Sequence, residues 1–144
     1  MSDIDRIEGA GIVAAAWAVT GAFAAWSVAA VVFTDALDTV AAGLDLGAFA
    51  VGIALFMVSF AQVVGRSRHE RIDVVGVYFL VGSAPSTVRR HLLGALAIQV
   101  VVAVLSAAIR PYTRVAFGVL VPMLGLALCG LWAARHGTFP AREG

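Results

Sequence analysis

The sequence contains no lysine, a single cysteine and few charged residues, which make up 13% of its 144 positions. The lone cysteine, Cys129, excludes an intramolecular disulfide and a metal site built from several thiolates. The net charge is only +1, which by itself says nothing about partners. We expect no nucleic-acid partner. Any information that charge carries must therefore lie in its distribution along the chain.

Apolar residues dominate, at 61% of the chain with a mean hydropathy of +0.95. This composition lies outside the range of ordinary soluble domains and is typical of integral membrane proteins. A helical span needs roughly 20 residues to cross a hydrocarbon core about 30 Å thick. The chain therefore has room for one bundle of about four spans, with no separate soluble domain.

Four apolar runs are long enough to cross a membrane, and they cover residues 11–33, 46–64, 92–109 and 115–134. The first run follows the acidic stretch "SDIDRIEG", so we interpret it as a retained span and not as a signal peptide. Lipid offers no hydrogen bonds to the backbone, and the runs lack the alternation of barrel strands. We expect an all-α fold in which residues 1–144 form one membrane domain with four transmembrane helices. Pro122 should kink the fourth.

The arginines are unevenly distributed between the connections. With both termini in the cytoplasm, eight arginines lie inside, namely Arg6, Arg66, Arg68, Arg71, Arg89, Arg90, Arg135 and Arg142. Only Arg110 and Arg114 then lie outside, in the short loop before the fourth span. Because cytoplasmic loops are enriched in positive residues, this distribution predicts an N-in/C-in multi-pass protein of the inner (cytoplasmic) membrane.

The predicted cytoplasmic loop, residues 65–91, contains a short run of apolar and glycine residues at 74–82. As a helix, nine residues rise only about 13.5 Å, less than half of the hydrocarbon core. We interpret this run as a segment at the cytoplasmic interface, with Tyr78 and Phe79 at the depth of the lipid headgroups. A short strand and a re-entrant segment remain alternatives.

The arginines around this segment either set only the topology or also bind an anionic lipid or an acidic partner. Each arginine near an anionic leaflet contributes on the order of 1 kcal/mol to membrane attraction. The two roles are compatible with each other. The candidate residues for contact with lipid or a partner are Arg66, Arg68, Arg71, Tyr78, Phe79, Arg89 and Arg90.

The predicted outer side combines an acidic connection with a basic one. Asp35, Asp38 and Asp45 lie between the first two spans, and Arg110 and Arg114 lie between the last two. We expect ion pairs between these two connections, although an exposed pair contributes only about 0 to 1 kcal/mol.

Polar residues within the spans are costly in lipid and are therefore candidates for function. Gln62 and Gln99 are the main ones, and we expect Gln99 to form a hydrogen bond between helices. No charged residue lies well inside a span, since Asp45 is near the outer end of the second. Ion-coupled transport, which needs an ionisable group at depth, is therefore disfavoured.

Signatures of catalysis are missing from the sequence. In "HERID", His69 and Glu70 are not followed by the second histidine of a zinc-protease helix, and no phosphate-binding glycine loop is present. The three histidines fall near the predicted cytoplasmic ends of the spans, where we expect them to be solvated. We therefore predict no enzymatic activity, cofactor or metal.

The stretches "GSAPSTVRRHLLGALAIQVVV" and "RPYTRVAFGVLVPMLGLALCGLWAARHGTFP" resemble a family of small four-span membrane proteins of high-GC bacteria. This resemblance covers about the C-terminal half of the chain, and it implies an architecture but no activity. In size and span count the chain is also similar to small multidrug transporters. The first span, however, lacks the embedded glutamate on which their proton coupling depends.

Two classes of function are consistent with these observations. The favoured one is a non-catalytic accessory component that contacts anionic membrane lipid or a membrane-protein partner through its arginine-rich loop. The alternative is a small transporter or flippase-like protein that works as a homo-oligomer. An inward-facing acidic residue or a continuous polar stripe would favour the alternative.

Overall fold

The computed structural model describes residues 3–143. Its helices, in chain order, are η1 (Asp3–Arg6), α1 (Ala10–Val32), α2 (Thr34–Arg66), α3 (Val74–Tyr78), α4 (Ser86–Ile109), η2 (Arg114–Leu120) and α5 (Pro122–His136). The described part contains no strand, and four segments are long and apolar enough to cross a membrane: α1, α2, α4, and η2 together with α5. This arrangement confirms the predicted all-α, four-span fold and is that of a multi-pass membrane protein.

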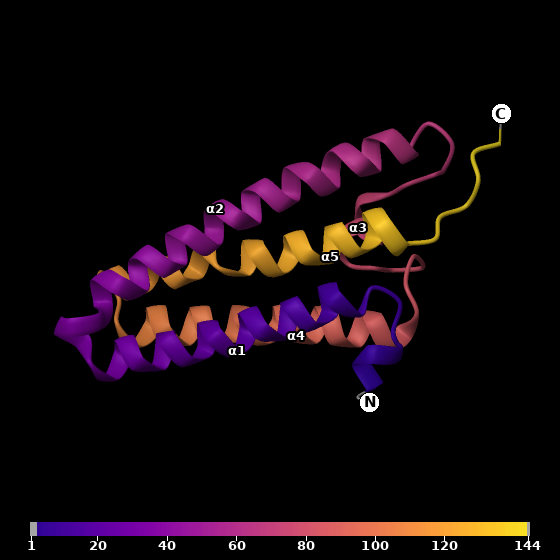
Figure 1. Ribbon diagram of the computed structural model, residues 1–144. Coiled ribbons are helices and arrows are strands. Elements are labelled where there is room, and N and C mark those ends of the chain that lie inside the picture. The colour runs from indigo at the N-terminus through magenta and orange to yellow at the C-terminus, as the bar shows by residue number, and fades with distance from the viewer. Residues whose placement is uncertain (1–2, 144) are drawn as a thin grey trace.

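The helices are arranged in layers (Figure 1): α1 lies beside α4, α5 lies next to this pair, and α2 covers the other side of α5. Helices α1 and α4 run in the same direction, because Trp17 contacts His91 and, further along both helices, Thr20 contacts Gln99. Both helices begin at the end of the bundle formed by residues 3–9, 67–85 and 137–143. We call this end the arginine-rich end, and the end formed by residue 33 and residues 110–113 the opposite end.

Helix α2 is longer than the sequence predicted. Residues 34–45, expected to form a connection, are instead the first turns of this helix, and only Phe33 separates it from α1. Alanine and leucine are strong helix formers, and Asp35 in the first turn is favourable at the positive end of the helix dipole. With 33 residues, α2 is about 50 Å long, which exceeds the hydrocarbon thickness of about 30 Å.

The fourth span has two parts. Pro122, which we expected to kink the span, is the first residue of α5, where its missing N–H is tolerated. The residues before it form the tighter 3-10 helix η2. Residues 124–134 of α5 are all buried except Leu126, because small side chains let the neighbouring helices approach closely.

The short apolar run at 74–82 forms the five-residue helix α3 and a turn, so among the alternatives it is a helix and not a strand. Leu80 has φ +58° and is fully buried, while Gly82 has φ +74°. This left-handed conformation is strained for leucine, and its burial in the core offsets the strain. The turn places α3 against α5 at the arginine-rich end.

Candidate functional site

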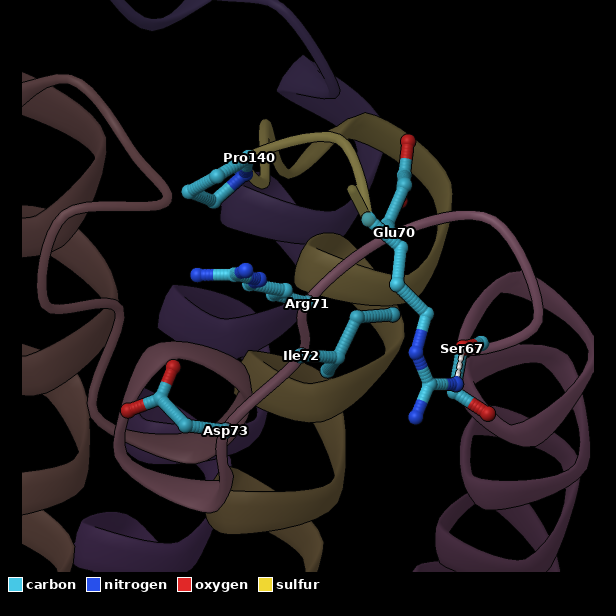
Figure 2. Close-up of a pocket in the computed structure, with 7 residues that line it drawn as sticks. Ser67, Glu70, Arg71, Ile72, Asp73 and Pro140 are labelled. Carbon is cyan, nitrogen blue, oxygen red and sulfur yellow. Dashed lines mark hydrogen bonds between the residues drawn. The ribbon is translucent and has the colours of Figure 1, made fainter. Parts of the chain in front are cut away.

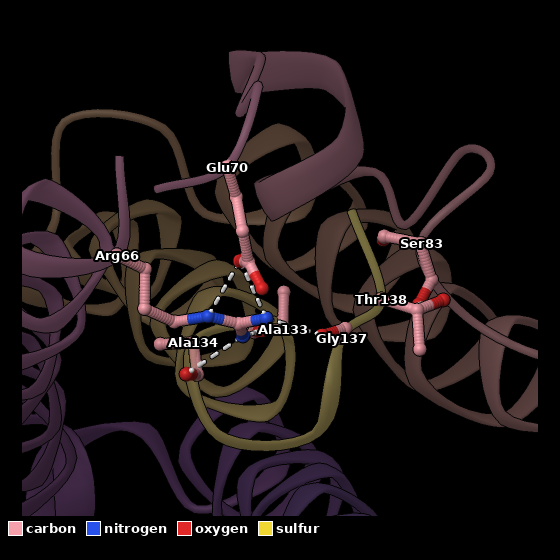
Figure 3. A network of polar contacts seen from close by, with 7 residues as sticks. All are labelled: Arg66, Glu70, Ser83, Ala133, Ala134, Gly137 and Thr138. Carbon is pink, nitrogen blue, oxygen red and sulfur yellow. Dashed lines mark hydrogen bonds and ion pairs between the residues drawn. The ribbon is translucent and has the colours of Figure 1, made fainter. Parts of the chain in front are cut away.

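Arg66, the last residue of α2, uses all of its donors inside the protein. Its Nε donates a hydrogen bond of 2.8 Å to Glu70. Its Nη2 forms an ion pair with the same carboxylate at 2.7 Å and donates to the carbonyl of Gly137 at 2.8 Å. Nη1 donates to the carbonyls of Ala133 and Ala134, both at 3.1 Å (Figure 3). Because a guanidinium has five N–H groups, none remains for a lipid headgroup.

Two of the carbonyls that Arg66 contacts, those of Ala133 and Ala134, belong to the last turn of α5, and the third, that of Gly137, directly follows the helix. The last carbonyls of a helix lack the next turn of amide donors, and here Arg66 supplies donors to them. A cation is also favourable at this negative end of the helix dipole. The guanidinium carbon lies 5.3 Å from the centre of the Phe139 ring, which adds a cation–π contact. Arg66 therefore joins the ends of α2 and α5 and is a structural residue, in place of the expected lipid contact.

The C-terminal tail runs antiparallel to the segment that follows α2. The amide of Arg71 donates to the carbonyl of Pro140 at 2.8 Å, and the amide of Arg142 donates to that of His69 at 2.9 Å. A pocket of about 550 Å³ lies between the two segments (Figure 2), and it is lined by Ser67, Glu70, Arg71, Ile72, Asp73, Pro140 and Arg142. Its two acidic and two basic side chains balance in charge, so the pocket does not favour an anion.

Tyr78 and Phe79 do not share one surface. Tyr78 is buried, and its ring stacks on Phe56 at 5.1 Å between centroids and 13° between planes. Burial raises the pKa of Tyr78, an effect opposed in part by Ser59. Phe79 is 49% exposed, because successive residues of a helix point about 100° apart. Of the two expected headgroup contacts, only Phe79 reaches the surface.

The other arginines of this end differ in how far they are engaged. Arg71 lies 3.7 Å from Glu143, but their side chains are 63% and 90% exposed, so this ion pair is weak. Arg68, Arg89 and Arg90 are exposed, and none of them forms a side-chain hydrogen bond or ion pair with the side chains and backbone that the structure describes. All three are therefore available to an external ligand.

At the opposite end, the described residues form none of the expected ion pairs. Arg114 donates to the hydroxyl of Thr39, which in turn donates to Asp38 at 3.2 Å, so the contact between Arg114 and Asp38 is indirect. No ion pair of Arg110 or Asp35 is found in the described part of the chain. The two connections therefore meet at Arg114 and Thr39, and the aspartates belong to helix α2 and not to a flexible loop.

Asp45 lies inside the bundle, which its place in the sequence did not indicate. The residue is 2% exposed, and its Oδ1 accepts a hydrogen bond of 2.9 Å from the indole Nε1 of Trp26. A Cβ at Gly118 would lie 3.7 Å from Oδ2, so the fourth span also faces the carboxylate. The sequence around Asp45 holds no signal for this burial, because Trp26 and Gly118 belong to other helices.

Gln99 forms the hydrogen bond between helices that we expected. It is fully buried, and its Nε2 donates to Thr20 at 2.8 Å, while the Thr20 hydroxyl donates to the carbonyl of Ala16 at 2.8 Å. Its Oε1 faces Gly125 and, like the Oε1 of Gln62, finds no donor within residues 3–143. Two further buried hydroxyl residues, Ser27 and Ser106, lie two turns beyond this pair on α1 and α4.

The histidines occupy separate places. His91 accepts a hydrogen bond of 3.2 Å from Trp17, His136 lies 3.6 Å from Glu8, and His69 is exposed. Within the described residues, no three potential metal ligands come together.

No protein-family model, curated protein or solved structure matches this chain. The resemblance to small four-span proteins of high-GC bacteria therefore stays an expectation from the sequence. Any inference about function therefore rests on the arrangement of side chains at the two ends and in the interior of the bundle.

Proposed function

We propose that this protein is a non-catalytic accessory component of the inner membrane. Its arginine-rich end faces the cytoplasm and contacts anionic lipid or a membrane-protein partner. The observation that carries this proposal is the division among its arginines. Arg66 is fully used within the fold, whereas Arg68, Arg89 and Arg90 are exposed and have no partner in the described residues.

The exposed arginines are solvated in water and are attracted to a surface of opposite charge, such as an anionic cytoplasmic leaflet. Each exposed arginine there is attracted by about 1 kcal/mol, and the attraction decays within a Debye length of about 8 Å. Three such side chains at one end of a bundle therefore supply a cooperative contact that salt weakens. An acidic membrane-protein partner would use the same charges.

The test is co-purification in mild detergent at low and high salt. The variant Arg68→Ala/Arg89→Ala/Arg90→Ala should lose a stoichiometric partner or the bound anionic lipid that the natural chain retains. The matched control is Arg110→Ala/Arg114→Ala, which removes arginines from the opposite end. Equal retention by both variants would overturn the proposal.

A second candidate is a small oligomeric transporter, and one observation favours it. Asp45 is a buried acidic residue that points inward, and Trp26 is its hydrogen-bond donor. Further buried polar groups lie on α1 and α4, from the middle of these helices toward the opposite end of the bundle. They belong to Thr20, Ser27, Gln99 and Ser106. A carboxylate in such a setting is a place where a proton or cation could be exchanged.

Proteoliposomes containing the pH indicator pyranine test this second candidate. If Asp45 carries protons, the natural chain dissipates an imposed pH gradient faster than Asp45→Asn does. Asp35→Asn, at the exposed start of the same helix, is the control and should behave like the natural chain. Equal rates for Asp45→Asn and the natural chain would remove the transporter from consideration.

A further inference from the structure

One face of α4 connects a basic pocket with an apolar groove. The basic pocket, of about 530 Å³, is lined by Ser86, Arg89, Arg90, Leu93 and Gly94 at the arginine-rich end. The groove, of about 380 Å³, begins one turn further along α4. Apolar side chains from α2, α4, α5 and the turn after α3 line it, among them Phe49, Phe79, Leu96, Val100, Met123 and Leu126.

The two hollows lie in line because of helical spacing. Arg89, Leu93, Leu96 and Val100 are separated by four, three and four residues, which places them on the same face of α4. From Arg89 to Val100 the helix rises about 16 Å, close to the thickness of about 15 Å that one leaflet contributes to the hydrocarbon core. This face of α4 therefore has arginines at one end, followed by apolar side chains over about the length of one lipid acyl chain.

We propose that this face binds one anionic phospholipid, with its phosphate at Arg89 and Arg90 and one acyl chain in the groove. This inference rests on the proposed function and specifies the ligand and the residues that hold it. Guanidinium groups bind phosphate oxygens through paired, charge-assisted hydrogen bonds. No acidic residue lines either hollow, so nothing in their walls competes for the arginines.

The shape of the groove favours a lipid chain over a helix of a partner protein. A transmembrane helix is about 10 Å across with its side chains and needs a face open along its length. At the arginine-rich side, this groove is bordered by Phe79, which projects from the turn after α3 and is 49% exposed. A flexible chain of methylene groups fits beside that ring.

The other basic positions fit this ligand less well. Arg66 has no free donor, and the pocket beside Arg71 and Arg142 also contains Glu70 and Asp73. Arg68 is exposed but lines neither hollow of α4. The site is therefore assigned to Arg89 and Arg90 with the groove.

Native mass spectrometry of the detergent-purified full chain tests the assignment with two probes that have the same acyl chains. Phosphatidylglycerol carries an anionic headgroup, and phosphatidylcholine a zwitterionic one. The natural chain should retain one phosphatidylglycerol in preference to phosphatidylcholine. Arg89→Gln/Arg90→Gln should weaken this retention on the order of tenfold, because two charge contacts are lost. Arg110→Gln/Arg114→Gln is the matched charge control.

The groove is tested by filling it. Val100→Trp places a large ring in the groove, whereas Val101→Trp places the same ring on the neighbouring face, outside it; both valines are exposed, so both variants should fold. We expect Val100→Trp, but not Val101→Trp, to reduce phosphatidylglycerol retention, with circular dichroism and elution volume unchanged for both.

The possible results separate this inference from the proposed function. If Val100→Trp retains the lipid as the natural chain does while Arg89→Gln/Arg90→Gln loses it, the groove is overturned and the arginine-rich contact surface stands. If Arg89→Gln/Arg90→Gln also retains both lipid and partner, both proposals fail. Equal retention of phosphatidylcholine and phosphatidylglycerol overturns the headgroup assignment.

Discussion

The indole of Trp26 donates a hydrogen bond of 2.9 Å to the buried carboxylate of Asp45, and this bond joins α1 to α2 near the opposite end of the bundle. The two residues are 19 positions apart, and the chain reverses direction at Phe33 between them. The bond therefore fixes the angle of a helical hairpin whose connection is a single residue.

Trp26→Phe should destabilise the fold, because it leaves the Asp45 carboxylate buried without its indole donor. We expect the free energy of unfolding to fall by about 1 to 3 kcal/mol, measured by unfolding in SDS. The partner variant Asp45→Ala and the double variant complete a double-mutant cycle. Strictly additive effects would show that the two side chains do not stabilise each other.

Arg66→Ala should destabilise the arginine-rich end, because it removes the hydrogen bonds to Glu70 and to the last carbonyls of α5. The expected loss is about 2 kcal/mol in the free energy of unfolding, since the site is partly exposed and water replaces some of these bonds. Arg66→Lys should restore little of it, because an ammonium group cannot reproduce the planar set of donors. Arg68→Ala, in the same segment but without partners in the described residues, is the control and should be neutral.

Apolar run length is a local property, and for this reason the four spans could be predicted from the sequence. The start of α2 could not, because aspartates at 35, 38 and 45 are as typical of a connection as of a helix. Whether Asp45 is exposed or buried depends on Trp26 and Gly118, which belong to other helices. Its burial is thus a tertiary property that no stretch of sequence around it contains.

The candidate contact surface was predicted in composition but not in detail. Nothing in the sequence distinguishes Arg66 from Arg89. In the structure, Arg66 binds carbonyls at the end of α5 and is a structural residue, whereas Arg89 is exposed and available to a ligand. Tyr78 and Phe79 are adjacent aromatic residues, yet the helical rotation between them sends one into the core and leaves the other exposed.

Gly130 provides a test of how tightly α3 packs against α5. A Cβ at this position would lie 2.6 Å from Cε1 of Tyr78 and 3.2 Å from the hydroxyl of Ser59. Gly130→Ala should therefore lower the free energy of unfolding by about 1 to 3 kcal/mol through overpacking. In Gly21→Ala the new methyl group meets nothing within 4 Å, so this control should be neutral or slightly stabilising. The reverse order of the two variants in SDS unfolding would contradict this packing.

The predicted orientation can be tested with single cysteines, since both described ends of the chain and the segment after α2 lie at the arginine-rich end. Cys129 is buried and is first replaced by alanine. Ser67→Cys and Thr138→Cys report on the arginine-rich end, and Thr39→Cys reports on the opposite one. In intact cells, an impermeant maleimide should label only Thr39→Cys, because eight arginines against two favour the cytoplasm for the other end.

Permeabilised cells should show labelling of all three variants, which controls for local access at each cysteine. Labelling of Ser67→Cys and Thr138→Cys but not of Thr39→Cys in intact cells would invert the topology, and it would place Arg89 and Arg90 outside, away from the anionic cytoplasmic leaflet on which the proposed contact depends.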